Sequence, residues 1–89
     1  MKLAAVVTDP SSGRTMRVLT NQPGVQFYTG NFMPADLPGK GGAVYGRQGG
    51  FCLETQDYPD AVNQPSFPDV VLRAGNVYRR ATKFAFSQE

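Results

Sequence analysis

Glu54 is the residue in this sequence best suited to acid–base chemistry. It is the only acidic side chain inside a predicted strand, residues 51–56, and a proline-rich segment follows that strand. A strand interior would hold the side chain partly desolvated, and partial desolvation makes a carboxylate a competent general base near neutral pH. The same position also fits a glutamate on the wet face of an edge strand. The sequence alone therefore leaves both readings of Glu54 open.

Histidine is absent from the sequence, which removes most other catalytic and metal-binding chemistry. Histidine is the usual acid–base group near neutral pH and the commonest metal ligand, so triads, zincin helices and Cys/His zinc sites are excluded within this chain. Cys52 is the single cysteine, and it can neither form an internal disulfide nor be activated by an imidazole. We expect a structural cysteine, no metal and no cofactor.

Three further groups of residues resemble sites without the spacing that a site requires. Asp57 and Asp60 could join Glu54 as a glycosidase pair or a calcium loop, but neither pattern has its diagnostic intervals. The glycines of residues 39–42 lack the flanking residues of a phosphate-binding loop, so we expect a solvent loop. The adjacent arginines 79 and 80 would point to opposite faces of a strand and form no single basic patch.

Composition bounds the class of protein. The 89 residues include 10 Gly and 7 Pro, which excludes long-helix architectures. The net charge of +2 comes from scattered basic residues, so the electrostatic footprint of a nucleic-acid-binding protein is absent. No apolar run approaches the roughly 20 residues that cross a bilayer, so no membrane span is expected. Nothing in the cysteine content demands an oxidising compartment, and we expect a cytoplasmic protein.

The elements that must position Glu54 are short strands separated by turns. Alternating or apolar runs end at clusters of Pro, Gly, Asn, Asp and Ser, a pattern typical of an antiparallel all-β protein. Gly and Pro also predict two long loops, residues 34–42 and residues 57–69. The last segment is predicted to be a hairpin, with strands at 70–73 and 77–86 around a turn at 74–76. The other predicted strands cover residues 2–8, 14–20, 25–29, 43–45 and 51–56.

Several of these segments together resemble the C-terminal part of the aldose 1-epimerase (galactose mutarotase) family. The resemblance is ordered and covers nearly the whole chain. It includes a Pro-Gly-x-Gln motif that ends at Gln26 and a Leu-Glu-Thr-Gln motif that contains Glu54. The matching segments are residues 9–14, 23–31, 50–56, 59–65 and 67–68, and residues 72–75 with Tyr78.

The resemblance implies both a fold and an activity. The fold would be the C-terminal portion of a galactose mutarotase-like β-sandwich, with the sugar bound in a cleft on the sheet. The activity would be interconversion of the α and β anomers of aldohexoses such as galactose and glucose, without a cofactor. Glu54 matches the catalytic base of the family, and Gln26 matches a glutamine that contacts the sugar.

The resemblance also implies what this chain lacks. The acid of the family is a histidine, and further pocket residues lie upstream of the matching region. Residues 1–89 are therefore expected to be the C-terminal segment of an aldose 1-epimerase-like domain without its N-terminal part, and to be inactive alone. Such a segment would self-associate through its exposed apolar face or strand edges. The alternative is a non-catalytic carbohydrate-binding or structural β module.

Overall fold

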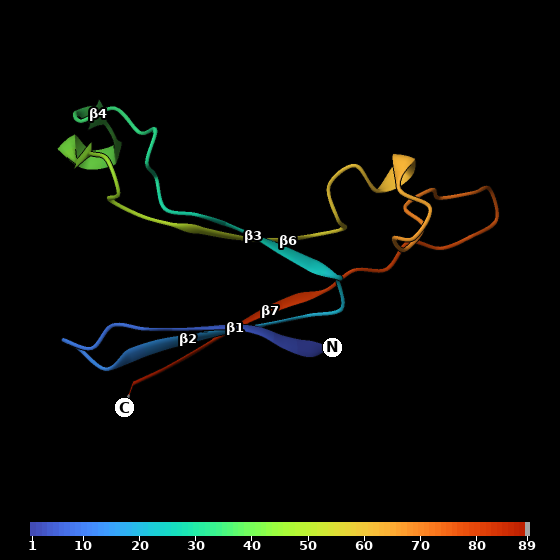
Figure 1. The fold of residues 1–89 in the computed structure, drawn as a ribbon. Helices are drawn as coiled ribbons and strands as arrows, with labels where there is room; N and C mark the ends of the chain where they lie inside the picture. Colours follow the sequence, from blue (N-terminus) through green and yellow to red (C-terminus); the bar gives the residue numbers. More distant parts are fainter. Residues whose placement is uncertain (89) are drawn as a thin grey trace.

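The computed structural model describes residues 1–88 and has the antiparallel all-β architecture that the sequence predicts (Figure 1). A three-stranded sheet has the order β1-β2-β7, and two two-stranded ribbons pair β3 with β6 and β4 with β5. Within the described residues no helix is long and apolar enough to cross a membrane. The strands are β1 Lys2–Thr8, β2 Arg14–Thr20, β3 Gly24–Tyr28, β4 Leu37–Pro38, β5 Val44–Tyr45, β6 Cys52–Gln56 and β7 Thr82–Gln88, with single 3₁₀ turns at Lys40–Gly42 and Ala61–Asn63.

The hairpin of β1 and β2 forms where the sequence predicts it. Its turn begins at Asp9, whose carboxylate accepts hydrogen bonds from the hydroxyls of Ser12 and Ser11 and from the amide of Ser11. These bonds, that from the Ser12 side chain foremost, lower the pKa of Asp9. Gly13 closes the turn with a φ of 74°, a conformation that glycine adopts without steric cost.

The predicted C-terminal hairpin is wrong. Residues 70–73 form no strand, and β7 pairs instead with β2, from Arg14 opposite Gln88 to Thr20 opposite Thr82. The turn between the predicted strands does form, since the amide of Asn76 donates to the carbonyl of Arg73. The local hairpin loses because β2 offers a seven-residue ladder on which Phe84 lies opposite buried Val18.

The ribbon of β3 and β6 lies above the sheet in the view of Figure 1 and comes closest to it at the start of β7, where Thr55 meets Thr82. Between these two strands the chain makes an arm, for which the sequence predicts a loop over residues 34–42 and a strand over residues 43–45; β5 agrees with that strand. The loop prediction is only partly correct, because the arm contains β4 and a 3₁₀ turn, and β4 pairs with β5 at Leu37–Tyr45 and Pro38–Val44. The predicted loop at 57–69 is irregular apart from its own 3₁₀ turn.

Three threonine hydroxyls connect the ribbon to the sheet. The Thr20 hydroxyl donates to the Ala81 carbonyl at 2.9 Å and lies 3.3 Å from the Thr82 hydroxyl, which lies 2.6 Å from the Thr55 hydroxyl. Each hydroxyl has one proton, so Thr82 must donate to Thr20 and Thr55 must donate to Thr82. This series of hydrogen bonds ends at the Gln22 side-chain amide, which donates to the Thr55 hydroxyl at 3.2 Å and to the Thr55 carbonyl at 3.1 Å.

The apolar core under these elements is small. Among the described residues, Val18 is the one fully buried apolar side chain, with 0% exposure. The chain has a radius of gyration of 17.0 Å, whereas a compact chain of this length has about 12 Å. Its accessible surface is 6979 Å², against roughly 5,100 Å² for a compact protein of this mass. The fold is therefore open.

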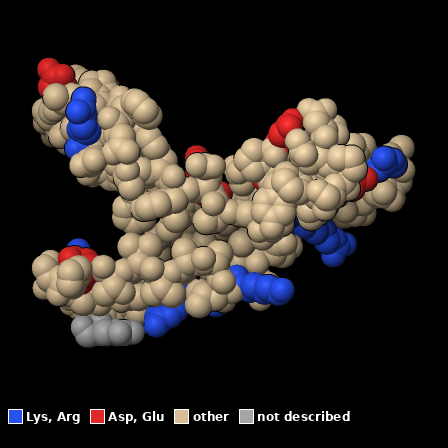
Figure 2. Space-filling view, viewed as in Figure 1, with Lys and Arg blue, Asp and Glu red and all other residues tan. Residues whose placement is uncertain are grey.

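A notch separates the arm of β4 and β5 from the turn that joins β1 and β2 (Figure 2). We call it the phenylalanine notch, and it is lined by Phe27, Phe51, Phe86 and Val7. The rings of Phe27 and Phe51 meet edge to face with centroids 6.3 Å apart, and both are about half exposed. An exposed apolar face was expected from the family resemblance, and these two rings are part of such a face.

We predict that a solvatochromic dye such as anilinonaphthalene sulfonate fluoresces on binding the phenylalanine notch. Phe51→Ser should reduce the fluorescence, because Phe51 lines the notch together with Phe27 of the ribbon and with Phe86 of the sheet. Phe32→Ser is the matched control, since Phe32 is 91% exposed and lies outside the notch. Absence of dye binding, together with a sharp cooperative thermal transition, would contradict an open fold.

We also predict that Thr55→Val loosens the attachment of the ribbon to the sheet. The substitution keeps the shape of the side chain and removes the hydroxyl, and one hydrogen bond of about 1 kcal/mol corresponds to a roughly fivefold change in local opening. Amide hydrogen exchange in β3 and β6 measures that opening. Thr55→Ser should restore protection from exchange. Thr29→Val, which removes a hydroxyl near the far end of β3, should leave protection unchanged. Equal exchange in Thr55→Val and wild type would show that the Thr55 hydroxyl does not hold the ribbon to the sheet.

Candidate functional site

Gln26 and Glu54 are direct partners across the β3–β6 ribbon. Directly opposed residues of an antiparallel pair place their Cβ atoms about 5 Å apart on the same face. The structure therefore brings together two side chains that are 28 positions apart in the sequence, an amide and a carboxylate. Both are exposed, so both are open to a ligand that approaches this face.

The face that carries this pair is turned away from the sheet. Side chains alternate along a strand, and Thr55, next to Glu54, points toward the sheet, where its hydroxyl meets Thr82. Three rungs share the outward face: Gly24 opposite Gln56, Gln26 opposite Glu54, and Tyr28 opposite Cys52.

The expected partial desolvation of Glu54 is not present. Its side chain is exposed, because a ribbon of two strands covers only the face that meets the sheet. The position on an edge strand, which the sequence offered as the plain alternative, is the one that the structure has. The Glu54 side chain is thus paired across the ribbon with Gln26 and exposed to solvent.

Cys52 does not serve as a core residue. Its thiol is free and exposed at the third rung, where Tyr28 is its partner on β3. The Tyr28 hydroxyl in turn accepts a hydrogen bond from the amide of Phe32 at 3.1 Å, which fixes the start of the arm. The alternation of β6 places Cys52 on the outward face with Glu54, so the cysteine that the sequence predicts to be structural is not part of the core.

The two aspartates that the sequence grouped with Glu54, Asp57 and Asp60, have other partners. Asp57 lies 3.6 Å from the Arg80 guanidinium, which also stacks on a tyrosine ring. Asp60 accepts hydrogen bonds from Asn63 and Gln64, and these bonds lower its pKa, that from Asn63 most. Over residues 1–88 no three His, Cys, Asp or Glu side chains gather into a possible metal site.

The glycine-rich segment belongs to the arm between β3 and β6 and not to the strand that carries Glu54. Residues 39–42 form an exposed turn in the arm, as expected for a solvent loop. Lys and Arg side chains are scattered over the face in Figure 2 and form no continuous patch there.

Asp69, at the far end of the long loop, accepts hydrogen bonds from the Val71 amide and from Arg73, and the pKa of its carboxyl is lowered for these reasons.

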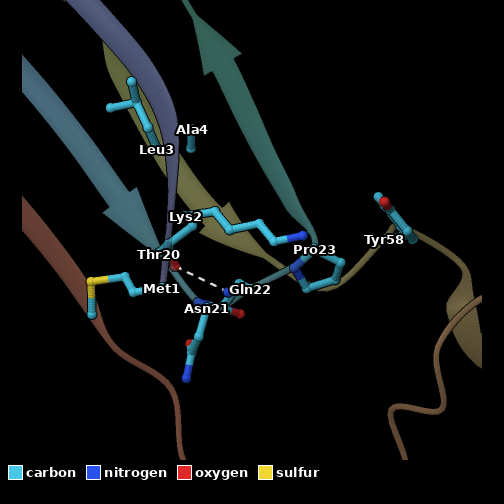
Figure 3. Close-up of a pocket in the computed structure, with 9 residues that line it drawn as sticks. All are labelled: Met1, Lys2, Leu3, Ala4, Thr20, Asn21, Gln22, Pro23 and Tyr58. Carbon is cyan, nitrogen blue, oxygen red and sulfur yellow. Dashed lines mark hydrogen bonds between the residues drawn. The ribbon is translucent and has the colours of Figure 1, made fainter.

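An open cavity of about 520 Å³ lies at the end of the ribbon, beside the first rung (Figure 3). The Lys2 side chain extends across it toward Pro23, and Tyr58 stands on the far side of Pro23. Sequence analysis did not single out Tyr58. The local pattern carried no clear signal for it, because Gly24, against which its ring lies, precedes the predicted strand 25–29 and is the first residue of β3 in the structure. The lining residues are Met1, Lys2, Leu3, Ala4, Thr20, Asn21, Gln22, Pro23 and Tyr58.

Comparison with known proteins gives one consistent family. Residues 1–85 match the family model described as aldose 1-epimerase. The chain is 60% identical to galactose mutarotase of Homo sapiens over 83 residues, which are 93% of this chain and 24% of that protein. It is 57% identical to galactose mutarotase of Rattus norvegicus over 86 residues, 97% of this chain and 25% of that protein.

A bacterial relative shows the same relation at greater distance. The chain is 36% identical to aldose 1-epimerase of Escherichia coli over 90 aligned positions, which cover 99% of this chain and 26% of that protein. The chain thus spans about a quarter of the length of the curated relatives that it matches. Since the family model covers nearly every residue, the chain belongs to the aldose 1-epimerase family.

Proposed function

We propose that this chain is the C-terminal part of an aldose 1-epimerase domain that interconverts the α and β anomers of aldohexoses such as galactose and glucose. The names of its relatives, galactose mutarotase and aldose 1-epimerase, support this activity and this substrate class. Their fourfold greater length supports the view that the whole domain includes polypeptide beyond residues 1–89. The open fold and the phenylalanine notch also agree with a surface that packs against such polypeptide.

The observation that carries the proposal is the direct pairing of Gln26 with Glu54. The pairing places a hydrogen-bonding amide beside a carboxylate on one exposed face, as the binding and the deprotonation of one sugar hydroxyl require. We assign the role of general base to Glu54 and the role of sugar ligand to Gln26. Both are exposed in this chain, so a sugar can reach them.

The reaction needs one base and one acid. The base takes the proton of the hydroxyl on the anomeric carbon C1, while the acid protonates the ring oxygen and the bond between C1 and that oxygen breaks. The open-chain aldehyde then rotates about its C1–C2 bond. Attack by the ring oxygen on either face of the aldehyde, with the two protons returned, gives either anomer, so no cofactor enters the balance.

The acid is not supplied by these residues. The chain contains no histidine, which is the residue type that the family resemblance implies for this role. We therefore place the acid, and the groups that desolvate Glu54, on the remaining part of the domain. Covering the outward face of the ribbon would remove water from Glu54 and strengthen it as a base.

We further propose a cytoplasmic location. The free, exposed thiol of Cys52 is compatible with a reducing compartment, where such a thiol stays reduced.

In the absence of a covering partner, the phenylalanine notch and the unpaired edges of β1 and β7 provide a route to self-association.

The second candidate is a non-catalytic carbohydrate-binding module. The exposure of Glu54 favours it, because a solvated carboxylate without a neighbouring acid can bind a sugar hydroxyl but has no partner for ring opening. Sugar binding by the chain with no catalysis, even when the rest of the domain is supplied, would select this candidate.

We predict that the chain alone has no mutarotase activity. Loss of one acid–base partner typically lowers a rate by about 10²–10⁴, and here much of the pocket is also absent. Polarimetry of freshly dissolved α-galactose or α-glucose at low buffer concentration measures the rate against a buffer control. A rate above that control which disappears in Glu54→Gln would show that these residues are a complete enzyme.

We predict distinct effects of the two substitutions in a chimera in which this chain replaces the matching quarter of human galactose mutarotase. Glu54→Gln should abolish turnover with little change in sugar binding, because the amide keeps the size of the side chain and loses its basicity. Gln26→Ala should weaken sugar binding by about three- to tenfold, the value of one hydrogen bond. Polarimetric kcat and KM separate the two effects, and the opposite phenotypes would mean that the two roles are exchanged.

A further inference from the structure

We propose that the Tyr58 ring is the apolar wall of the sugar site, against which the C–H face of the hexose rests. The inference deepens the proposed function and depends on the sugar lying at Gln26 and Glu54. Nothing in the family comparison assigns a role to this tyrosine. Three features of the structure fix its position: the contact of its ring with Gly24, the packing of its ring against Phe67, and the turn that follows it in the sequence.

The first feature is the contact with Gly24. A methyl group built on Gly24 would stand only 3.2 Å from the Cδ1 atom of Tyr58 and 3.4 Å from its Cε1 atom, so the ring lies against the bare strand. Gly24 belongs to the first rung of the outward face, two residues before Gln26. The strand therefore carries no side chain where the ring needs room, and the ring takes its place on the face that holds Glu54.

The second and third features fix the ring. Its centroid lies 5.2 Å from that of Phe67, at an interplanar angle of 58°, so an aromatic partner supports it from the long loop. The Tyr58 carbonyl accepts a hydrogen bond from the Ala61 amide at 3.2 Å, which closes a turn. Asp60, in the left-handed conformation with a φ of 61°, anchors that turn through Asn63 and Gln64. The ring is thus held before any ligand arrives.

The spacing suits a pyranose. Rungs on one face of a strand are about 6.7 Å apart, so the ring stands one rung away from the pair formed by Gln26 and Glu54. A hexose whose anomeric hydroxyl meets Glu54 extends across that interval. The side chain is 40% exposed, so part of the ring is free to meet a ligand.

The chemistry of the ligand matches a wall of this kind. An aldohexose presents hydroxyl groups around its rim and a patch of axial C–H bonds on one face. The amide and the carboxylate satisfy hydroxyls, whereas an aromatic ring satisfies the C–H patch and excludes water from it. Tyr58 is accordingly a positioning residue for sugar orientation, and the proton transfers do not require its hydroxyl.

Saturation-transfer difference NMR of the full chain with D-galactose tests the proposal. Irradiation of aromatic protons should transfer saturation to the C–H protons of the sugar in the wild-type chain. Tyr58→Phe should keep the transfer because it keeps the ring, and Tyr58→Ala should reduce it about threefold or more. Tyr78→Ala is the matched control, since Tyr78 is an exposed tyrosine in the segment that precedes β7, and its ring stacks on Arg80.

The outcomes separate this inference from the proposed function. Transfer that is lost in Gln26→Ala but unchanged in Tyr58→Ala would leave the sugar site in place and overturn the role of Tyr58. Transfer that is unchanged in Gln26→Ala would place the sugar elsewhere and refute both. Absence of transfer in the wild-type chain would overturn the proposal that Tyr58 forms a sugar-binding wall in this chain. The roles of Glu54 and Gln26 would still be decided by the kinetics of the chimera.

Discussion

A chain of three threonine hydroxyls joins the two layers of this molecule. It runs from the Gln22 amide through Thr55, Thr82 and Thr20 to the Ala81 carbonyl, and each hydroxyl both donates and accepts. Apolar packing contributes little at this point, since Val18 is the one fully buried apolar residue among those described. The attachment of the ribbon to the sheet therefore depends on a polar network, which is specific in direction because each hydroxyl has only one proton.

The outward face of the ribbon follows from that attachment. Thr55 can reach Thr82 only if the odd-numbered positions of β6 face the sheet, and Glu54 must then face away. The same alternation turns Gln26 outward, because it is the direct partner of Glu54. One interlayer hydrogen bond thus fixes the side on which the candidate site lies, and a register shift of one residue would move both side chains to the opposite face.

The openness of the fold and the state of Glu54 have the same physical origin. A two-stranded ribbon with one covered face leaves its other face in water, and the phenylalanine notch shows that the covered side is also incompletely packed. In the proposed domain, one event would bury the notch and desolvate the carboxylate. Folding of the remainder of the domain and activation of the base would then be coupled, because burial drives the first and tunes the second.

Residue types and spacing in the sequence were sufficient to predict the local features. Alternation and turn chemistry predicted β1, β2 and the Asp9 turn, and two motifs indicated Gln26 and Glu54 as candidate site residues, because these signals depend on neighbours along the chain. The partner of β7, the exposure of Glu54 and Cys52, and the contact of Tyr58 with Gly24 were decided only by the tertiary structure. Each of these depends on which distant segment covers a given face. Pairing and burial between segments far apart in sequence are set by competition among all available partners, and a local pattern carries no record of that competition.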